Sequence, residues 1–246
     1  QIETGRRGFL GSAGLVIGAG IAATIPGCGN ETTPTTGGGG TGTPENPETP
    51  TPAEGAVNEV APGQLDSYYG FWSGGQSGEI RILGVPSMRE LKRIPVFNRD
   101  AATGYGADDF SKELLRGRSS GDTHHVHLSY DNGTYDGRYV FVNDKAGARL
   151  GRVRIDTMEC DAIVDIPFSH GTHGIFPQRH HTGLVLCNSE FRAPLPIAGI
   201  DPADPSTYAA LHTAIDGETM EVKWQVMIEG NLDLCATDYE GKYSFA

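Results

Sequence analysis

Residues 121–130 read GDTHHVHLSY and bring His124, His125 and His127 within four positions of one another. This stretch holds three of the chain's eight histidines. Neutral imidazole is the commonest side-chain ligand of transition metals and the usual acid or base near neutral pH. A pair of histidines at the mouth of a strand is therefore a candidate site, although an isolated group of histidines is more often solvated or satisfied inside a core.

The same order of features recurs further along the chain, which strengthens the candidate. His125 is followed by turns and then by the apolar strand YVFVN at 139–143. His173 is likewise followed by a turn and then by LVLCN at 184–188. The two strands begin 45 residues apart. A repeated combination of histidine, turn and strand indicates a repeated structural unit.

Short strands separated by glycine turns, with a period of about 40–50 residues, are typical of β-propeller blades. A third, looser copy leads from 231–233 to a strand at 239–245, and the Pro-rich stretch 193–207 accounts for its longer spacing. We therefore predict an all-β chain folded as part of a β-propeller. The other expected elements are strands at 79–85, 150–155, 162–166 and 218–229, a strand or short helical turn at 87–96, a helix at 111–117, and hairpin turns at Asn132-Gly133, Asp136-Gly137 and Asp216-Gly217.

In a propeller the innermost strand of each blade lines a central channel, so residues that begin these strands gather at one mouth. His125 and His173 take this position in the two repeats and are predicted to meet at one metal centre. Adjacent residues of a regular strand point to opposite faces, which would pair His125 with His127 instead. His124 and His125 can share a site only if they lie in a loop before the strand or straddle a large cluster.

The chain has 246 residues and a net charge of −12. This length fits one sizeable domain or two small ones, and the acidic balance argues against nucleic acid or anionic membrane surfaces as partners. The chain opens on Gln1 and stops at Ala246 within an expected strand, so we expect a fragment of a longer chain.

Residues 1–28 are predicted to be an export signal. Arg6-Arg7 precedes a Gly/Ala-rich run at 11–24, which looks like a twin-arginine signal, with a Sec-type signal as the alternative. Cys28 follows a sequence that resembles a lipoprotein cleavage box and could tether the protein to a membrane. Residues 29–59 form an expected disordered Thr/Gly/Pro linker, and residues 60–246 the partial propeller.

Several motifs resemble the amino-terminal half of nitrous oxide reductases, in the family's order and at similar spacing. They are YYGFWSGG at 68–75, GVPSMREL at 84–91, RIPVFN at 93–98, GDTHH at 121–125, FVNDK at 141–145, His173-Gly174 and GNLD at 230–233. The resemblance runs from about Gln64 to the end of the chain. It implies an exported homodimeric enzyme of the periplasm or cell surface, with a seven-bladed propeller followed by a cupredoxin domain.

In this family the propeller holds the copper–sulfide cluster CuZ, the cupredoxin domain holds CuA, and N2O is reduced to N2 and water. The resemblance implies that His124, His125 and His173 are CuZ ligands, with His127 beside them or in the channel. The external electron donor would be a cytochrome or a cupredoxin. The other four histidines match no family motif and are expected at the surface or in loops: His170, His180, His181 and His212.

The chain departs from the family pattern in two respects. Thr123 stands where a cysteine is common, which we expect to be tolerated. The remaining cluster ligands, the calcium site and the CuA domain would lie beyond residue 246, so the fragment alone is expected to be inactive. Asp122 and Asp233 could bond to the site or supply protons, but turn formation is the more ordinary role.

On the residues alone, two other functions are alternatives. A non-catalytic, lipid-tethered propeller could serve as a binding module, since propellers host many functions. Such a module has no need for histidines at matching strand starts. A zinc hydrolase would need a pattern such as a helical His-Glu-x-x-His, which the sequence lacks. Cys160, Cys187 and Cys235 have no metal-binding spacing and are expected to be buried as small apolar residues.

Overall fold

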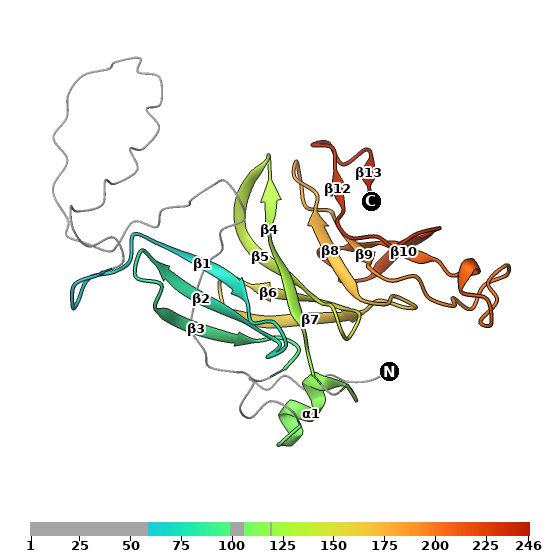
Figure 1. Ribbon diagram of the computed structural model, residues 1–246. Coiled ribbons are helices and arrows are strands. Elements are labelled where there is room, and N and C mark those ends of the chain that lie inside the picture. Colours follow the sequence, from blue (N-terminus) through green and yellow to red (C-terminus); the bar gives the residue numbers. More distant parts are fainter. Residues whose placement is uncertain (1–58, 99–105, 119) are drawn as a thin grey trace, which may run out of the picture.

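The computed structural model describes residues 59–98, 106–118 and 120–246. Its strands form antiparallel sheets joined in chain order (Figure 1). The first sheet contains β1 (Tyr68–Ser73), β2 (Glu79–Val85) and β3 (Glu90–Pro95). The second contains β4 (Thr123–Asp131), β5 (Thr134–Asp144), β6 (Arg149–Arg154) and β7 (Glu159–Asp165). The third contains β8 (Thr172–Pro177), β9 (Leu184–Ser189), β10 (Ala210–Asp216) and β11 (Val222–Ile228).

The second and third sheets have the same layout. Each is a four-stranded antiparallel meander whose first strand is an edge, and the two edges β4 and β8 lie next to each other (Figure 1). A short hairpin of β12 (Ala236–Thr237) and β13 (Ser244–Phe245) follows. Repeated four-stranded meanders with their first strands together are blades of a β-propeller, so the predicted fold class is confirmed.

Apolar contacts between successive sheets explain why the central strands are hydrophobic on both faces. Val140 and Val142 of β5 pack with the first sheet, whereas Phe141 between them packs with the third. Successive side chains of a strand alternate between its faces, so a strand covered on both sides reads as a continuous apolar run. The YVFVN and LVLCN runs therefore mark strands buried between blades.

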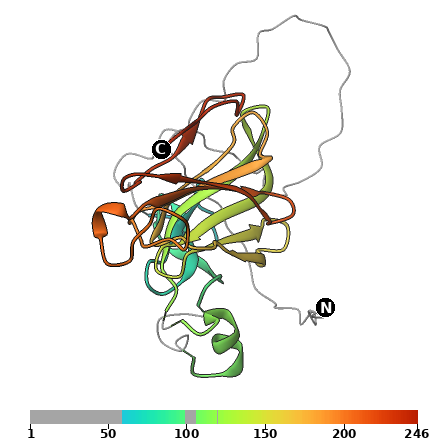
Figure 2. The same ribbon diagram turned by 90° about the vertical axis from the view of Figure 1, so that its right-hand side faces the viewer.

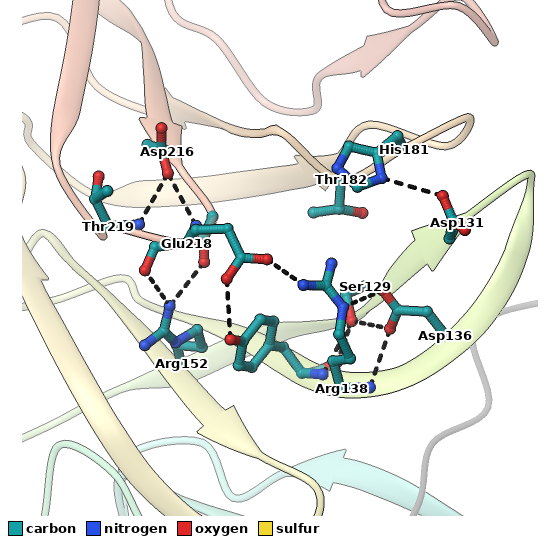
Figure 3. A network of polar contacts seen from close by, with 12 residues as sticks. Ser129, Asp131, Asp136, Arg138, Arg152, His181, Thr182, Asp216, Glu218 and Thr219 are labelled. Carbon is teal, nitrogen blue, oxygen red and sulfur yellow. Dashed lines mark hydrogen bonds and ion pairs between the residues drawn. The ribbon is translucent and has the colours of Figure 1, made fainter.

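Polar contacts tie the second sheet to the third on the side away from β1–β3 (Figure 3). The Arg152 guanidinium pairs with Asp161 and donates hydrogen bonds to the carbonyls of Gly217 (2.9 Å) and Glu218 (2.6 Å). The Glu218 carboxylate in turn accepts a hydrogen bond from the hydroxyl of Tyr139 at 3.0 Å. These contacts join β5 and β6 to the turn that links β10 and β11.

The helix α1 (Asp109–Leu115) lies at the end of the molecule opposite β12–β13 (Figure 2). The side chain of Asp108 accepts a hydrogen bond from the backbone N–H of Ser111, and Ser111 returns one, which makes a capping box. Arg116 adopts the left-handed conformation that ends the helix. The predicted helix at 111–117 is thus present, with its start two residues earlier.

Some predicted elements are confirmed and others are wrong. The strands at 79–85 and 184–188 and the Asn132-Gly133 hairpin turn are present, and 87–96 contains a strand. Asp136-Gly137 is not a hairpin turn, because β5 continues through it. The third predicted strand at 239–245 is wrong for most of its length, because a turn after β12 occupies it and only β13 at its end is a strand.

The fold also contains strands that the sequence does not predict, among them β1, β8 and β10. β10 follows the Pro-rich stretch, and its sequence ALHTAID has neither an apolar run nor the alternation of apolar and polar residues that marks a strand. Burial between neighbours on both sides, rather than propensity, makes it a strand. The predicted export signal, Cys28 and all but Glu59 of the linker lie outside the described residues. Within the described part of the chain, no helix is long and apolar enough to cross a membrane.

Candidate metal centre

A β-bulge occurs at the same place in two successive blades. Thr123 pairs with Asp144 and Val126 with Val142, so His124 and His125 together lie opposite one residue of β5. A bulge places an extra residue in one strand and redirects its side chains. This irregularity lets two adjacent histidines serve one site inside a strand, where regular pleating would send them to opposite faces.

The second bulge has the same register in β8 and β9. Thr172 pairs with Ser189 and Ile175 with Cys187, which leaves His173 and Gly174 opposite one residue. By position His173 therefore corresponds to His124. The predicted equivalence of His125 and His173 was one residue out of register, because sequence spacing alone does not reveal a bulge.

The two bulges bring three imidazole rings together. The ring of His173 has its centroid 4.5 Å from that of His124 and 4.7 Å from that of His125, and the latter two are 5.5 Å apart. The Nε2 atoms of His125 and His173 are separated by 3.3 Å. Imidazole nitrogens bind metals such as zinc at about 2.0–2.1 Å, so this separation suits two nitrogens on one ion.

The carboxylate of Asp233 hydrogen-bonds to the Nδ1 atom of His173. A carboxylate at this nitrogen holds the proton on Nδ1 and leaves the Nε2 lone pair free for a metal. Gly174 brings this segment close, because its N–H donates to the Asp233 carbonyl at 3.0 Å. The segment before β12 thus contributes an orienting carboxylate, whereas β4 and β8 contribute ring nitrogens.

Burial and neighbouring charge favour the neutral form of two of these rings. Desolvation lowers the pKa of His125, and the adjacent rings of His173 and His124 lower it further. Burial also lowers the pKa of His124, with His173 the next cause. A neutral imidazole presents the lone pair that a metal needs, so both side chains suit ligation at neutral pH.

Asp122 and His127 flank the three rings. Burial raises the pKa of the Asp122 carboxyl. The ring of His127 stacks on that of His125 at a centroid distance of 6.4 Å and lies 6.2 Å from that of Phe176. His127 thus lies beside the three-ring group, next to His125.

The remaining histidines lie apart from this group. His170 and His181 are exposed, and His180 is partly exposed. The Nδ1 atoms of His180 and His181 bond to Glu240 and Asp131 at 2.9 and 3.1 Å. His212 contradicts the expected surface position, because it is buried in β10 beside Asn188.

No set of three or more His, Cys, Asp or Glu side chains in the described part of the chain has the arrangement that a single metal ion requires. Cys187 and Cys235 are buried as expected, whereas Cys160 is partly exposed, and all three thiols are free. The neutral rings, the facing Nε2 atoms and the carboxylate behind His173 nevertheless fit copper, for which imidazole is a suitable ligand.

The fold and the histidine group define a class: a β-propeller whose innermost strands gather histidines at one place. The family model described as nitrous oxide reductase propeller repeat 2 matches residues 166–234. Nitrous-oxide reductase from Ralstonia nicotianae is 46% identical over 97% of this chain and 38% of that protein. The enzyme from Stutzerimonas stutzeri is 44% identical over 100% of this chain and 38% of that protein.

A third relative, nitrous-oxide reductase from Pseudomonas fluorescens, is 45% identical over 97% of this chain and 36% of its own length. The chain is a homologue of the nitrous-oxide reductases, and the resemblance predicted from its motifs is confirmed. It spans little more than a third of the length of these relatives.

Proposed function

We propose that this chain is the part of a nitrous-oxide reductase that supplies His124, His125 and His173 to its copper–sulfide cluster, CuZ. The observation that carries the proposal is the convergence of these three rings at paired bulges of two blades. The similarity to nitrous-oxide reductases along nearly the whole chain supports it. Further ligands, calcium and the CuA domain would come from the rest of the protein.

The cluster, when bound, would supply the two electrons for reduction of N2O to N2 and water. This chain's own side chains have simpler roles. The three imidazoles bind and hold copper, and Asp233 fixes the tautomer and ring plane of His173. Asp122, whose pKa is raised by burial, can carry a proton near the site.

The wider context belongs to the same proposal. The protein would act as a homodimer in the periplasm or at the cell surface, after export by the twin-arginine route, with a possible lipid tether at Cys28. An external cytochrome or cupredoxin would deliver the electrons.

The test is a comparison of the complete wild-type protein with His125→Ala and His173→Ala. We expect both variants to lose cluster copper, its visible absorption and N2O reduction together, while any CuA signal survives. His181→Ala is the matched control, because His181 is exposed and lies apart from the three rings. If both site variants keep copper and activity, these histidines are structural, which would favour a non-catalytic propeller module.

A further inference from the structure

Asn143 lies at the end of β5, directly opposite the bulge of β4, and is fully buried. Both the oxygen and the nitrogen of its side-chain amide form hydrogen bonds. Its Oδ1 atom accepts a hydrogen bond from the backbone N–H of His125. Its Nδ2 group donates to the carbonyls of Thr172 at 2.6 Å and His173 at 2.9 Å.

One buried side chain therefore holds the bulges of two different blades. The side-chain oxygen of Asn143 accepts from the backbone of His125. Its side-chain nitrogen donates to the carbonyls of Thr172 and His173. A buried amide that loses a partner costs free energy, so this three-way contact resists displacement of either bulge. The 3.3 Å separation of the two Nε2 atoms depends on where those backbones lie.

Asn188 occupies the equivalent position in the next blade, and a comparison with it shows which hydrogen bonds of Asn143 are particular to the histidine site. Asn188 is also fully buried, and its Nδ2 group likewise donates to a carbonyl of the following segment, that of Leu234, at 2.7 Å. Its Oδ1 atom, however, bonds to the ring of His212. Donation to the next blade is thus repeated, whereas acceptance from a histidine-bearing bulge occurs at Asn143.

We infer that Asn143 is a positioning residue for the copper site: its amide sets the distance between the rings of His125 and His173. It touches neither ring and acts only through the backbone. The inference rests on the proposed function, since it assumes that these rings bind copper. Residues that orient metal ligands typically contribute about 10- to 100-fold to metal affinity.

The variant Asn143→Asp keeps the size and an acceptor oxygen but replaces the donor that holds the second bulge. Asn143→Ala, which removes the whole amide, is the second variant. Arg152→Gln is the control, because Arg152 joins the same two sheets through hydrogen bonds to the carbonyls of Gly217 and Glu218 (Figure 3). Each would be made in the complete protein, with copper per chain, visible absorption, electron paramagnetic resonance and Tm as readouts.

We expect both Asn143 variants to bind copper about 10- to 100-fold more weakly and to show altered spectra of the copper that remains. Arg152→Gln should lower Tm by at least as much yet keep the wild-type spectrum. Wild-type copper affinity and spectra in both Asn143 variants would overturn the inference. So would copper loss that merely follows Tm across all three variants.

The His125→Ala and His173→Ala variants separate this failure from failure of the proposed function. If they lose copper while the Asn143 variants keep it, the site stands and the role of Asn143 falls. If the His125→Ala and His173→Ala variants keep copper, the site assignment is wrong, and so is the proposed role of Asn143.

Discussion

At the scale of single residues, the same bulge position accepts a histidine in one blade and only a glycine in the next. A Cβ atom at Gly174 would lie 2.5 Å from the carbonyl oxygen of Asp233 and 2.8 Å from the Cα of Leu234. Both atoms belong to backbone, which cannot move aside without shifting the segment that carries the Asp233 carboxylate. The corresponding residue of the earlier blade is His125, which explains a His-His pair in one repeat and His-Gly in the other.

Gly174→Ala should therefore disturb both stability and the site. We expect a loss of about 1–3 kcal/mol from overpacking. Weaker copper binding should accompany it, because the carboxylate behind His173 is displaced. Urea unfolding and copper analysis would measure the two effects. Gly183→Ala in the same blade is the control, since its Cβ would meet its nearest neighbour at an ordinary 3.5 Å. Equal effects of the two substitutions would contradict this account.

Because His212 is buried, we expect the free energy of unfolding to depend on pH. Burial lowers its pKa below the ordinary value of 6.5, and its Nε2 atom has no hydrogen-bond partner. The unfolded chain therefore binds a proton more readily than the folded chain, so stability is lost as pH falls below about 6.5 toward the lower folded pKa. His212→Gln should lose less stability than wild type between pH 7 and pH 5 in urea titrations. The exposed His170→Gln should keep the wild-type loss, and an identical pH response in both variants would count against the explanation.

The three described cysteines are predicted to be poor nucleophiles. Desolvation of the sulfur atom raises the pKa of Cys235 and of the partly exposed Cys160 to about 12, and that of Cys187 well above its ordinary value. At pH 8 a thiol with a pKa of about 12 is roughly one part in ten thousand thiolate, which is the reactive form. Native protein treated with iodoacetamide should show negligible alkylation at these positions by peptide mass spectrometry, with full alkylation in urea. Rapid native labelling of any of them would show that the thiol is accessible and ionised.

At the scale of elements, the blades are joined differently at their two ends. Near β4 and β8, amide side chains and bulged backbones make the contacts, and the chain's three site rings lie there. Toward β6 and β7, the guanidinium of Arg152 bridges the sheets through hydrogen bonds to the carbonyls of Gly217 and Glu218, while it pairs with Asp161 and lies 4.5 Å from the ring centroid of Tyr139 in its own sheet. Interblade stability and site geometry can therefore be changed separately.

Arg152→Gln should cost about 2–4 kcal/mol of unfolding free energy, because it leaves Asp161 and two carbonyls without their partner. Arg154→Gln, on the same strand, is the control. Arg154 is exposed and pairs with the neighbouring Asp156 in a contact of the kind that contributes little. Urea unfolding at one pH would compare them. A similar cost for both would show that the blade-bridging contacts of Arg152 carry no particular weight.

At the scale of the whole molecule, the chain supplies three of the proposed ligands and spans little more than a third of its relatives. The 246-residue chain expressed alone is therefore expected to show no N2O reduction, as measured by N2 formation with a reduced dye. The complete protein under the same conditions is the control. Turnover by the isolated chain would mean that these blades alone can assemble an active centre.

The sequence by itself determined the fold class, two of the blade repeats and the similarity to nitrous-oxide reductases. Apolar runs such as YVFVN and LVLCN report burial on both faces, and the motifs around His124, His125 and His173 are long enough to be specific. It also determined that these three histidines are the candidates, although only by resemblance. Strands without a clear apolar pattern, such as β10, could not be predicted, because their burial depends on neighbours that are distant in the chain.

Only the tertiary structure decided how adjacent histidines can share a site and which residues hold them there. A bulge is a mismatch between two paired strands, so it is a property of the pairing and not of either strand's sequence. The contacts of Asn143 with Thr172 and His173, and of Asp233 with His173, join residues 29 to 60 positions apart. Such contacts form only once the blades have packed together, which is why spacing along the chain cannot reveal them.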